Sequence, residues 1–247
     1  DNLPLLLDAI YKTMHTLGRS WELILVDDGS SDKSLSILKE YAEKDPEHIR
    51  VISFRRNFGQ TAAIAAGLDY SQGEIIVLLD ADMQNDPADI PMMLAKLDEG
   101  YDLVSGWRKQ RKDNAVTRNF PSMLANWLIS RVTGVHLHDY GCTLKAYRRD
   151  VLEGFRLYGE MHRFIPVYAN SVGAHITEVP VRHHPREFGK TKYGLERTVK
   201  VVLDLFTVKF LVSYASKPIY LFGGAGSFLM AVSALIMSYL FVRRWFF

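Results

Sequence analysis

The apolar run Ile75–Leu79 most constrains how this chain can fold. It has no polar residue in alternation, which is typical of a strand buried on both faces of a parallel sheet. The run ends directly in Asp80 and Asp82, which are separated by one residue. Ligands of open α/β sheets bind beyond the carboxyl ends of the strands, so both carboxylates are predicted to lie at a cleft. An Asp-x-Asp pair alone is equally compatible with an ordinary polar loop.

The residue types at this strand end suit a hard divalent cation. Mg²⁺ and Mn²⁺ take oxygen ligands, usually one or two carboxylates together with substrate phosphates. Asp80 and Asp82 supply carboxylates, and Gln84 supplies an amide carbonyl two residues further on. The sequence therefore predicts a metal site formed by these three residues.

Predicted strands and helices alternate along most of the chain. Strand patterns occur at Trp21–Val26, Ile49–Phe54, Ile75–Leu79, Tyr101–Ser105, Thr143–Tyr147 and His175–Val181. Helical patterns occur at Leu5–Leu17, at Thr61–Tyr70, at Ala88–Glu99, at Ala115–Val132, around Arg163–Ser171, and from a cap at Ser31 or Asp32 to about Glu43. Short connections between alternating elements predict an α/β fold with a doubly wound, mostly parallel sheet.

Size and charge limit the possible classes of protein. A chain of 247 residues can bury one sizeable core and carry an appendage. Its formal net charge of +2 is too small for a nucleic-acid binder with a strongly basic face. The single cysteine, Cys142, excludes an intramolecular disulfide and a multi-cysteine zinc site. Asp1 opens into a helical pattern where an α/β fold normally has a core strand, so we expect the natural N-terminus to lie upstream.

The C-terminal part predicts attachment to a lipid bilayer. Ile219–Val242 has no charged residue, and at about 1.5 Å per residue it is about 36 Å long, enough to cross a hydrocarbon core of about 30 Å. Lys217 precedes it and Arg243 and Arg244 follow it, as expected for residues at membrane interfaces. We therefore predict a transmembrane helix; a long buried helix is the alternative.

The segment before this helix is predicted to be amphipathic. Glu196–Ser213 carries one narrow polar stripe on an apolar helix, which suits either the membrane interface or packing on the preceding domain. The expected organisation is a catalytic domain at 1–194, an amphipathic helix at 195–217 and a transmembrane segment at 218–247. Gly223, Gly224 and Gly226 permit close helix packing, which leaves a homo-oligomer open.

A second acidic cluster follows an earlier predicted strand. Asp27–Ser30 comes directly after Trp21–Val26. Its carboxylates can accept hydrogen bonds from a nucleobase or ribose, while Asp80 and Asp82 hold a cation against a diphosphate. Since both strand ends point to one edge of the sheet, the two clusters together predict a cleft for a nucleotide-sugar.

Five motifs follow one another along the chain: Val26–Ser30, Arg56–Gln60, Asp80–Gln84, Asp139–Cys142 and Arg186–Tyr193. They occur in the order found in family 2 glycosyltransferases, and the match covers nearly the whole soluble part. The sequence resembles the polyprenyl-phosphate branch of that family, which includes dolichyl-phosphate mannose synthases and bacterial undecaprenyl-phosphate sugar transferases. Family members usually begin with a strand of the Val-Ile-Pro-Val-Tyr-Asn type and often carry a second membrane helix, so we expect this chain to be truncated at both ends.

The resemblance implies a GT-A type, Rossmann-like domain that transfers a sugar with inversion from a nucleotide to a polyisoprenyl phosphate, with UDP-glucose and undecaprenyl phosphate as the favoured pair. It implies Mg²⁺ or Mn²⁺ at Asp80, Asp82 and Gln84, and catalytic roles for Asp82 and Asp139. The implied nucleotide contacts are Asp27, Asp28, Gly29, Ser30, Asn57, Gln60, Asp80 and Ala81. The implied contacts of the acceptor phosphate are Arg108, Arg118, Ser122, Arg186 and Lys192.

Several alternatives stay open at this point. A phosphate monoester with a second pKa of about 6 is already anionic near neutral pH, so Asp139 is as well suited to orienting a neighbour as to accepting a proton. GDP-mannose is the second donor candidate, and a non-catalytic membrane scaffold is the rival class. A processive polysaccharide synthase should show a Gln-x-x-Arg-Trp segment, which Trp107, Trp127 and Trp245 do not supply. Because nucleotide sugars are generally cytosolic, we expect a bacterial inner-membrane protein with a cytoplasmic catalytic domain.

Overall fold

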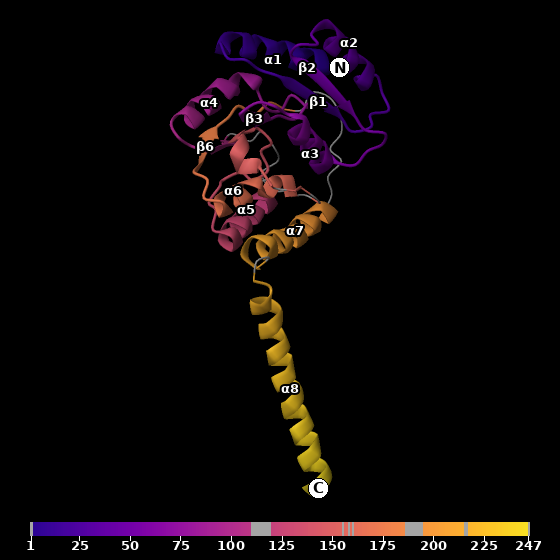
Figure 1. Ribbon diagram of the computed structural model, residues 1–247, viewed down its shortest axis with the longest axis vertical. Helices are drawn as coiled ribbons and strands as arrows, with labels where there is room; N and C mark the ends of the chain where they lie inside the picture. Colours follow the sequence, from indigo (N-terminus) through magenta and orange to yellow (C-terminus); the bar gives the residue numbers. More distant parts are fainter. Residues whose placement is uncertain are drawn as a thin grey trace. The chain divides into compact units, whose positions relative to one another are not determined.

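The structure is a computed structural model that describes residues 2–109, 120–154, 156–157, 159, 161–185, 195–214 and 217–246. For 120–125 and 195–202 it describes the backbone alone. The chain divides into two compact units, Asp1–Leu205 and Phe206–Phe247. Figure 1 shows the strands gathered in the first unit and the long helix α8 in the second.

The described strands form two sheets. In the first, β1 (Leu23–Asp27) pairs in parallel with β2 (Ile49–Ser53). The second has the order β3-β5-β4-β6, with bounds Ile75–Leu78, Lys145–Arg148, Leu103–Trp107 and Ile176–Pro180 in that order. β4 and β6 are parallel, whereas β5 is antiparallel to both β3 and β4. The predicted α/β class is confirmed, and β5 is the one described strand of this sheet that runs against the others.

Every helical pattern expected in the described residues forms a helix, with shifted ends. The helices of the first part are α1 (Asn2–Leu17), α2 (Ser34–Lys44), α3 (Gln60–Tyr70), the 3₁₀ turn η1 (Pro87–Asp89) and α4 (Ile90–Asp98). Those of the later part are α5 (Phe120–Thr133), the 3₁₀ turns η3 (Arg149–Leu152) and η4 (Met161–Phe164), α6 (Ile165–Ser171), α7 (Leu195–Tyr214) and α8 (Ile219–Phe246). The N-cap of α2 is Lys33, one or two residues later than the predicted Ser31 or Asp32, although the Asp32 carboxylate does accept the Ser34 N–H at 2.9 Å.

A buried core supports the strand ends that carry the acidic motifs. Met93 and Leu97 of α4 are fully buried against the second sheet, where they join Val104, Leu144 and Ala146. These side chains are the apolar positions that the strand and helix patterns predict to face inward. The core therefore holds β4 and β5 in place, and it fixes the strand ends to which the neighbouring loops are attached.

An apolar cleft of about 930 Å³ lies between β1 and β3. Leu23–Val26 of β1 line one side and residues of β3 line the other, while α1 contributes Leu6 and Ile10. Gln60 and Asp80 also line the cleft.

The second unit contains α8, whose described side chains are almost all exposed. The helix has a mean hydropathy of 1.9 in its most apolar window, and none of that window is buried. By length and composition α8 can cross a membrane, as the sequence predicts. The predicted amphipathic segment forms α7, in which Leu203 and Phe206 are exposed.

Candidate active site

Two loops meet beyond the ends of β1 and β2, and the acids of the first loop hold them together. Asp27 is buried, and its carboxylate accepts the Ser30 N–H and the Ser53 hydroxyl at 3.3 and 3.4 Å. The Asp28 carboxylate accepts the backbone N–H groups of Phe58 at 2.7 Å and Gly59 at 2.9 Å. Such charge-assisted bonds make Asp28 the link between the two predicted nucleotide motifs.

Gly29 permits the close approach of these loops. Its φ is +69°, and an added Cβ would lie 2.5 Å from the Arg56 carbonyl carbon and 2.7 Å from the Asn57 nitrogen. We expect Gly29→Ala to lower the free energy of unfolding by about 2–4 kcal/mol, since left-handed backbone strain and overpacking add. Urea unfolding measures the change.

Gly18→Ala is the matched control for this prediction. Gly18 has a φ of +61° and no heavy atom within 4 Å of its added Cβ, so this variant adds the backbone strain without the collision. The difference between the losses of stability in the two variants measures the cost of the collision between the two loops. Equal losses of stability in both variants would contradict the prediction.

Asp80 is held rigidly at the end of β3. The Gln60 side-chain amide donates to one carboxylate oxygen at 2.8 Å, and the Thr143 hydroxyl donates to the other at 2.5 Å. Burial raises the pKa of Asp80, and the nearby Asp82 charge adds to this effect. The carboxylate is therefore fixed between α3 and the segment that leads into β5.

The following turn presents Asp82 and Gln84. The Asp82 carboxylate accepts the Gln84 N–H at 3.1 Å, and Met83 between them has a φ of +60°. Among the described residues, Met83 is the one non-glycine residue with a positive φ. Backbone strain of this kind costs about 1–3 kcal/mol and persists where its surroundings enforce it, which marks this turn as a candidate functional element.

The oxygen donors of this turn fit a hard cation. Asp82 offers a carboxylate and Gln84 a carbonyl oxygen, with Asp80 beside them, and Mg²⁺ and Mn²⁺ prefer such ligands. In the part of the chain that the structure describes, no group of three His, Cys, Asp or Glu side chains forms a closed metal site. The donor set therefore suits a cation that completes its shell with oxygens of a substrate.

On the other side of β5, Arg108 and Asp139 form a bidentate ion pair. Arg108 Nε donates to Asp139 Oδ2 at 2.7 Å, and Nη2 donates to Oδ1 at 2.9 Å. The Asp139 side chain is 3% exposed and that of Arg108 is 15% exposed. Arg108 follows β4 and Asp139 precedes β5, so neighbouring strands bring the pair together.

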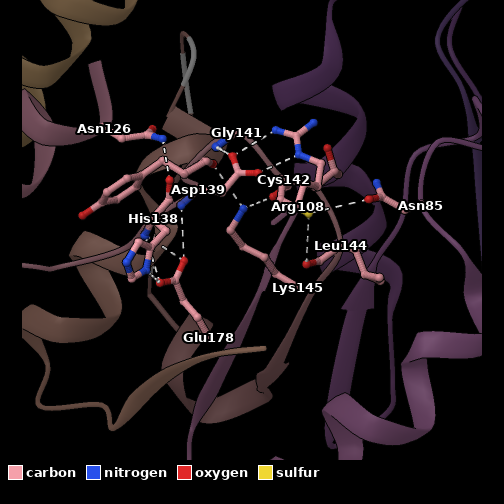
Figure 2. A network of polar contacts seen from close by, with 12 residues as sticks. Asn85, Arg108, Asn126, His138, Asp139, Gly141, Cys142, Leu144, Lys145 and Glu178 are labelled. Carbon is pink, nitrogen blue, oxygen red and sulfur yellow. Dashed lines mark hydrogen bonds and ion pairs between the residues drawn. The ribbon is translucent and has the colours of Figure 1, made fainter. Parts of the chain in front are cut away.

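A buried lysine closes the loop that carries Asp139. Lys145 Nζ donates to the carbonyl oxygens of Tyr140, at 3.3 Å, and of Cys142 (Figure 2). Burial lowers the pKa of Lys145. The Cys142 thiol contacts the Asn85 side chain, which directly follows the Asp80–Gln84 turn, at 3.6 Å. The turn and the Asp139 loop thus touch each other.

Part of the predicted acceptor site is outside the described residues. Arg118, Arg186 and Lys192 lie there, and Ser122 falls in α5 where the backbone alone is described. Arg108 is described and lies in the polar network of Figure 2. Ala81 lies with Asp80 at the end of the cleft beside β3, and Asn57 donates to the backbone oxygen of Asp28 at 3.3 Å.

Three residues that contact these loops were not predicted from the sequence: Thr143 and Lys145, described above, and Glu178, whose carboxylate accepts the His138 N–H at 2.9 Å. Each lies in or next to a strand that was predicted from its apolar neighbours. A lysine in Thr143–Tyr147 and a glutamate in His175–Val181 are charged residues inside short core strands, and buried charges need partners. A charged residue inside an apolar strand was therefore the signal that could have identified Lys145 and Glu178.

Comparison with known proteins places the chain in a family. Residues 2–155 match the model described as "Glycosyl transferase family 2". The dodecaprenyl-phosphate galacturonate synthase of Rhizobium johnstonii is 46% identical over 238 residues, which are 95% of this chain and 70% of that protein. The undecaprenyl-phosphate 4-deoxy-4-formamido-L-arabinose transferase of Klebsiella pneumoniae is 44% identical over 207 residues, which are 84% of this chain and 63% of that protein.

A solved structure shares the fold at low sequence identity. The glucosyl-3-phosphoglycerate synthase of Mycobacterium tuberculosis, in complex with Mn²⁺, uridine diphosphate and glucosyl-3-phosphoglycerate, superposes with a TM-score of 0.57 at 17% identity. The likeness covers 85% of this chain and 76% of that one, and it supports the GT-A fold. With its family model matched over more than half of its length, the chain belongs to glycosyl transferase family 2.

Proposed function

We propose that this chain transfers a sugar from a nucleotide donor to the phosphate of a polyisoprenyl lipid, with inversion at the anomeric carbon. One observation carries the proposal: the Asp80–Gln84 turn and the Arg108–Asp139 pair lie on the two sides of β5, and the segment between Asp139 and β5 contacts Asp80 through Thr143 and Asn85 through Cys142. A cation-binding turn and a guanidinium are the groups needed to hold a diphosphate and a phosphate beside each other.

On the donor side, the two joined loops form the nucleotide site. Asp27, Asp28, Gly29 and Ser30 shape the first loop, and Asn57 and Gln60 belong to the second. Gln60 also donates to Asp80, so the nucleotide loops and the metal turn are coupled. Asp82 and Gln84, next to Asp80 and Ala81, would hold a divalent cation, and that cation would supply positive charge against the departing nucleoside diphosphate.

On the acceptor side, the geometry favours an orienting role for Asp139. Both of its carboxylate oxygens accept hydrogen bonds from Arg108, and Oδ1 also accepts the Gly141 N–H at 3.1 Å. An anionic phosphate needs no base to become a nucleophile. Asp139 therefore holds the guanidinium in position, and Arg108 binds the acceptor phosphate with Arg118, Ser122, Arg186 and Lys192.

The names of the relatives refine the choice of donor sugar. The sequence analysis favours glucose, whereas the two relatives are named for galacturonate and for 4-deoxy-4-formamido-L-arabinose. We rank UDP-galacturonic acid first because the Rhizobium relative is the more similar of the two, followed by UDP-glucose. GDP-mannose stays the alternative with a different base.

The membrane-spanning capacity of α8 fits a lipid acceptor. A polyisoprenyl phosphate lies at the bilayer surface, and anchoring the catalytic domain there raises the effective concentration of the acceptor. We place the domain on the cytoplasmic face of a bacterial inner membrane, where nucleotide sugars are made.

Transfer of radiolabelled sugar to undecaprenyl phosphate by the detergent-solubilised chain tests the proposal. UDP-galacturonic acid, UDP-glucose, the UDP-linked formamido-arabinose and GDP-mannose are compared, each with Mg²⁺, with Mn²⁺ and with a chelator. We expect label in the lipid from a UDP-sugar, and only with metal. Label from none of the four donors, although the nucleotide still binds, would contradict the proposal.

A further inference from the structure

Glu178 lies in β6, outside every motif named above, yet its carboxylate accepts several hydrogen bonds from one loop. It accepts the backbone N–H of His138 at 2.9 Å and that of Asp139 at 3.3 Å. It also contacts Nδ1 of the His138 ring at 2.9 Å, and the Glu178 side chain is 11% exposed. Figure 2 shows this carboxylate directed at the start of the Asp139 loop.

Two opposite charges hold this loop at its two ends. Glu178 binds N–H groups where the loop begins, and Lys145 binds the carbonyl oxygens of Tyr140 and Cys142 where it ends. Hydrogen bonds to charged groups are about twice as strong as those between neutral groups. Asp139 lies between these two sets of contacts, so they restrain the backbone from which its side chain projects.

The contacts of His138 also extend to β4, the strand that ends directly before Arg108. The His138 ring stacks on Trp107, with ring centroids 4.3 Å apart and an interplanar angle of 21°. Trp107 ends β4 and directly precedes Arg108. Glu178 thus fixes both the Asp139 backbone and the ring that lies against the Arg108 segment.

From this geometry we infer that Glu178 is a positioning residue of the acceptor site: it acts through the His138–Asp139 backbone to orient the Asp139–Arg108 pair toward the acceptor phosphate. The inference rests on the proposed function, because that function assigns the phosphate to Arg108. Glu178 itself does not touch the substrate. Small displacements of a group that positions a substrate can cost up to about 100-fold in rate.

The variant Glu178→Gln tests this inference in the detergent-solubilised chain. The amide keeps the size of the side chain but loses the charge and presents an NH₂ group to N–H donors. We expect the KM for undecaprenyl phosphate to rise by about tenfold, while the KM for the nucleotide sugar changes by less than about twofold. Hydrogen–deuterium exchange at the His138 and Asp139 amides should become faster.

Two further variants separate positioning from general damage. Glu178→Asp keeps the charge and should raise the acceptor KM less than the amide does. Glu99→Gln is the matched control, since Glu99 forms an exposed ion pair with Lys96 at the end of α4 and should leave both KM values unchanged. Should the Gln variant not fold, Glu178→Asp is compared with the wild-type chain: the shorter side chain should still raise the acceptor KM, and an unchanged acceptor KM overturns the inference.

The outcomes distinguish this inference from the proposed function. An unchanged acceptor KM, or a lower kcat with both KM values unchanged, overturns the role of Glu178. If the wild-type chain transfers no sugar to any polyprenyl phosphate, the proposed function fails, and amide exchange then decides alone. Faster exchange at His138 and Asp139 in the Gln variant supports the role of Glu178, and unchanged exchange overturns it.

Discussion

Asp82→Ala is expected to reduce sugar transfer at least about 1,000-fold while the chain stays folded. Asp82 supplies the carboxylate of the proposed metal turn, and a catalytic cation stabilises the transition state by several kcal/mol. Each loss of about 1.4 kcal/mol lowers the rate tenfold. In the protein, Asp82 accepts the Gln84 N–H, so its loss also loosens the turn that presents Gln84. Transfer is measured over a range of Mn²⁺ concentrations.

Asp98→Ala is the control for this variant. Asp98 forms an exposed ion pair with Arg19, and exposed pairs contribute about 0–1 kcal/mol, so transfer should be unchanged. Asp82→Asn retains one carbonyl oxygen and should recover part of the activity at high Mn²⁺. If Asp82→Ala transfers sugar at the wild-type rate at low Mn²⁺, Asp82 is not a ligand of the metal.

Arg108→Ala should damage both stability and acceptor use. It leaves the Asp139 carboxylate, 3% exposed, without its bidentate partner, and breaking a buried pair from one side costs about 3–5 kcal/mol. The variant also removes the proposed ligand of the acceptor phosphate. We expect a lower urea midpoint together with an acceptor KM raised by about tenfold or more, since a charged hydrogen bond contributes about 1.5–3 kcal/mol.

The double variant Arg108→Met/Asp139→Leu separates these two effects. Replacing a buried ion pair by apolar side chains of similar volume is often neutral for stability, so the double variant should recover most of the lost stability. Acceptor use should stay impaired, because no guanidinium is present. If stability and acceptor KM recover together, the pair is structural and the phosphate assignment is wrong.

Much of the fold and of the donor side can be predicted from the residue pattern. The runs at Leu23–Val26 and Ile75–Leu79 end in acidic clusters, and strand periodicity is enough to predict that these acids follow the strand ends. Of these acids, Asp80 lines the cleft beside β3. Local signals of this kind depend on neighbours in the chain. The apolar stretch of α8 is predictable for the same reason, since length and lack of charge suffice.

The direction of β5 and the partners of the buried charges depend on contacts between distant segments. β5 is short and its pattern is the same in either direction, so its antiparallel pairing with β3 and β4 follows from the path of the chain. That pairing brings Thr143 to Asp80, 63 residues away in sequence. It also brings Lys145 beneath the Asp139 loop.

The same limit explains why the partner of Asp139 was not predicted and why Glu178 was not noticed. Asp139 belongs to a motif that the sequence shows, whereas Glu178 lies within a predicted strand and belongs to no motif. The hydrogen-bond partners of both carboxylates depend on the tertiary structure. Arg108 is 31 residues from Asp139, and Glu178 is 40 residues from His138. The residue pattern predicts which side chains follow the strand ends, because periodicity is a local property of the sequence. The packing of β4, β5 and β6 determines which of these side chains bond to each other, because it brings together segments that are far apart in the sequence.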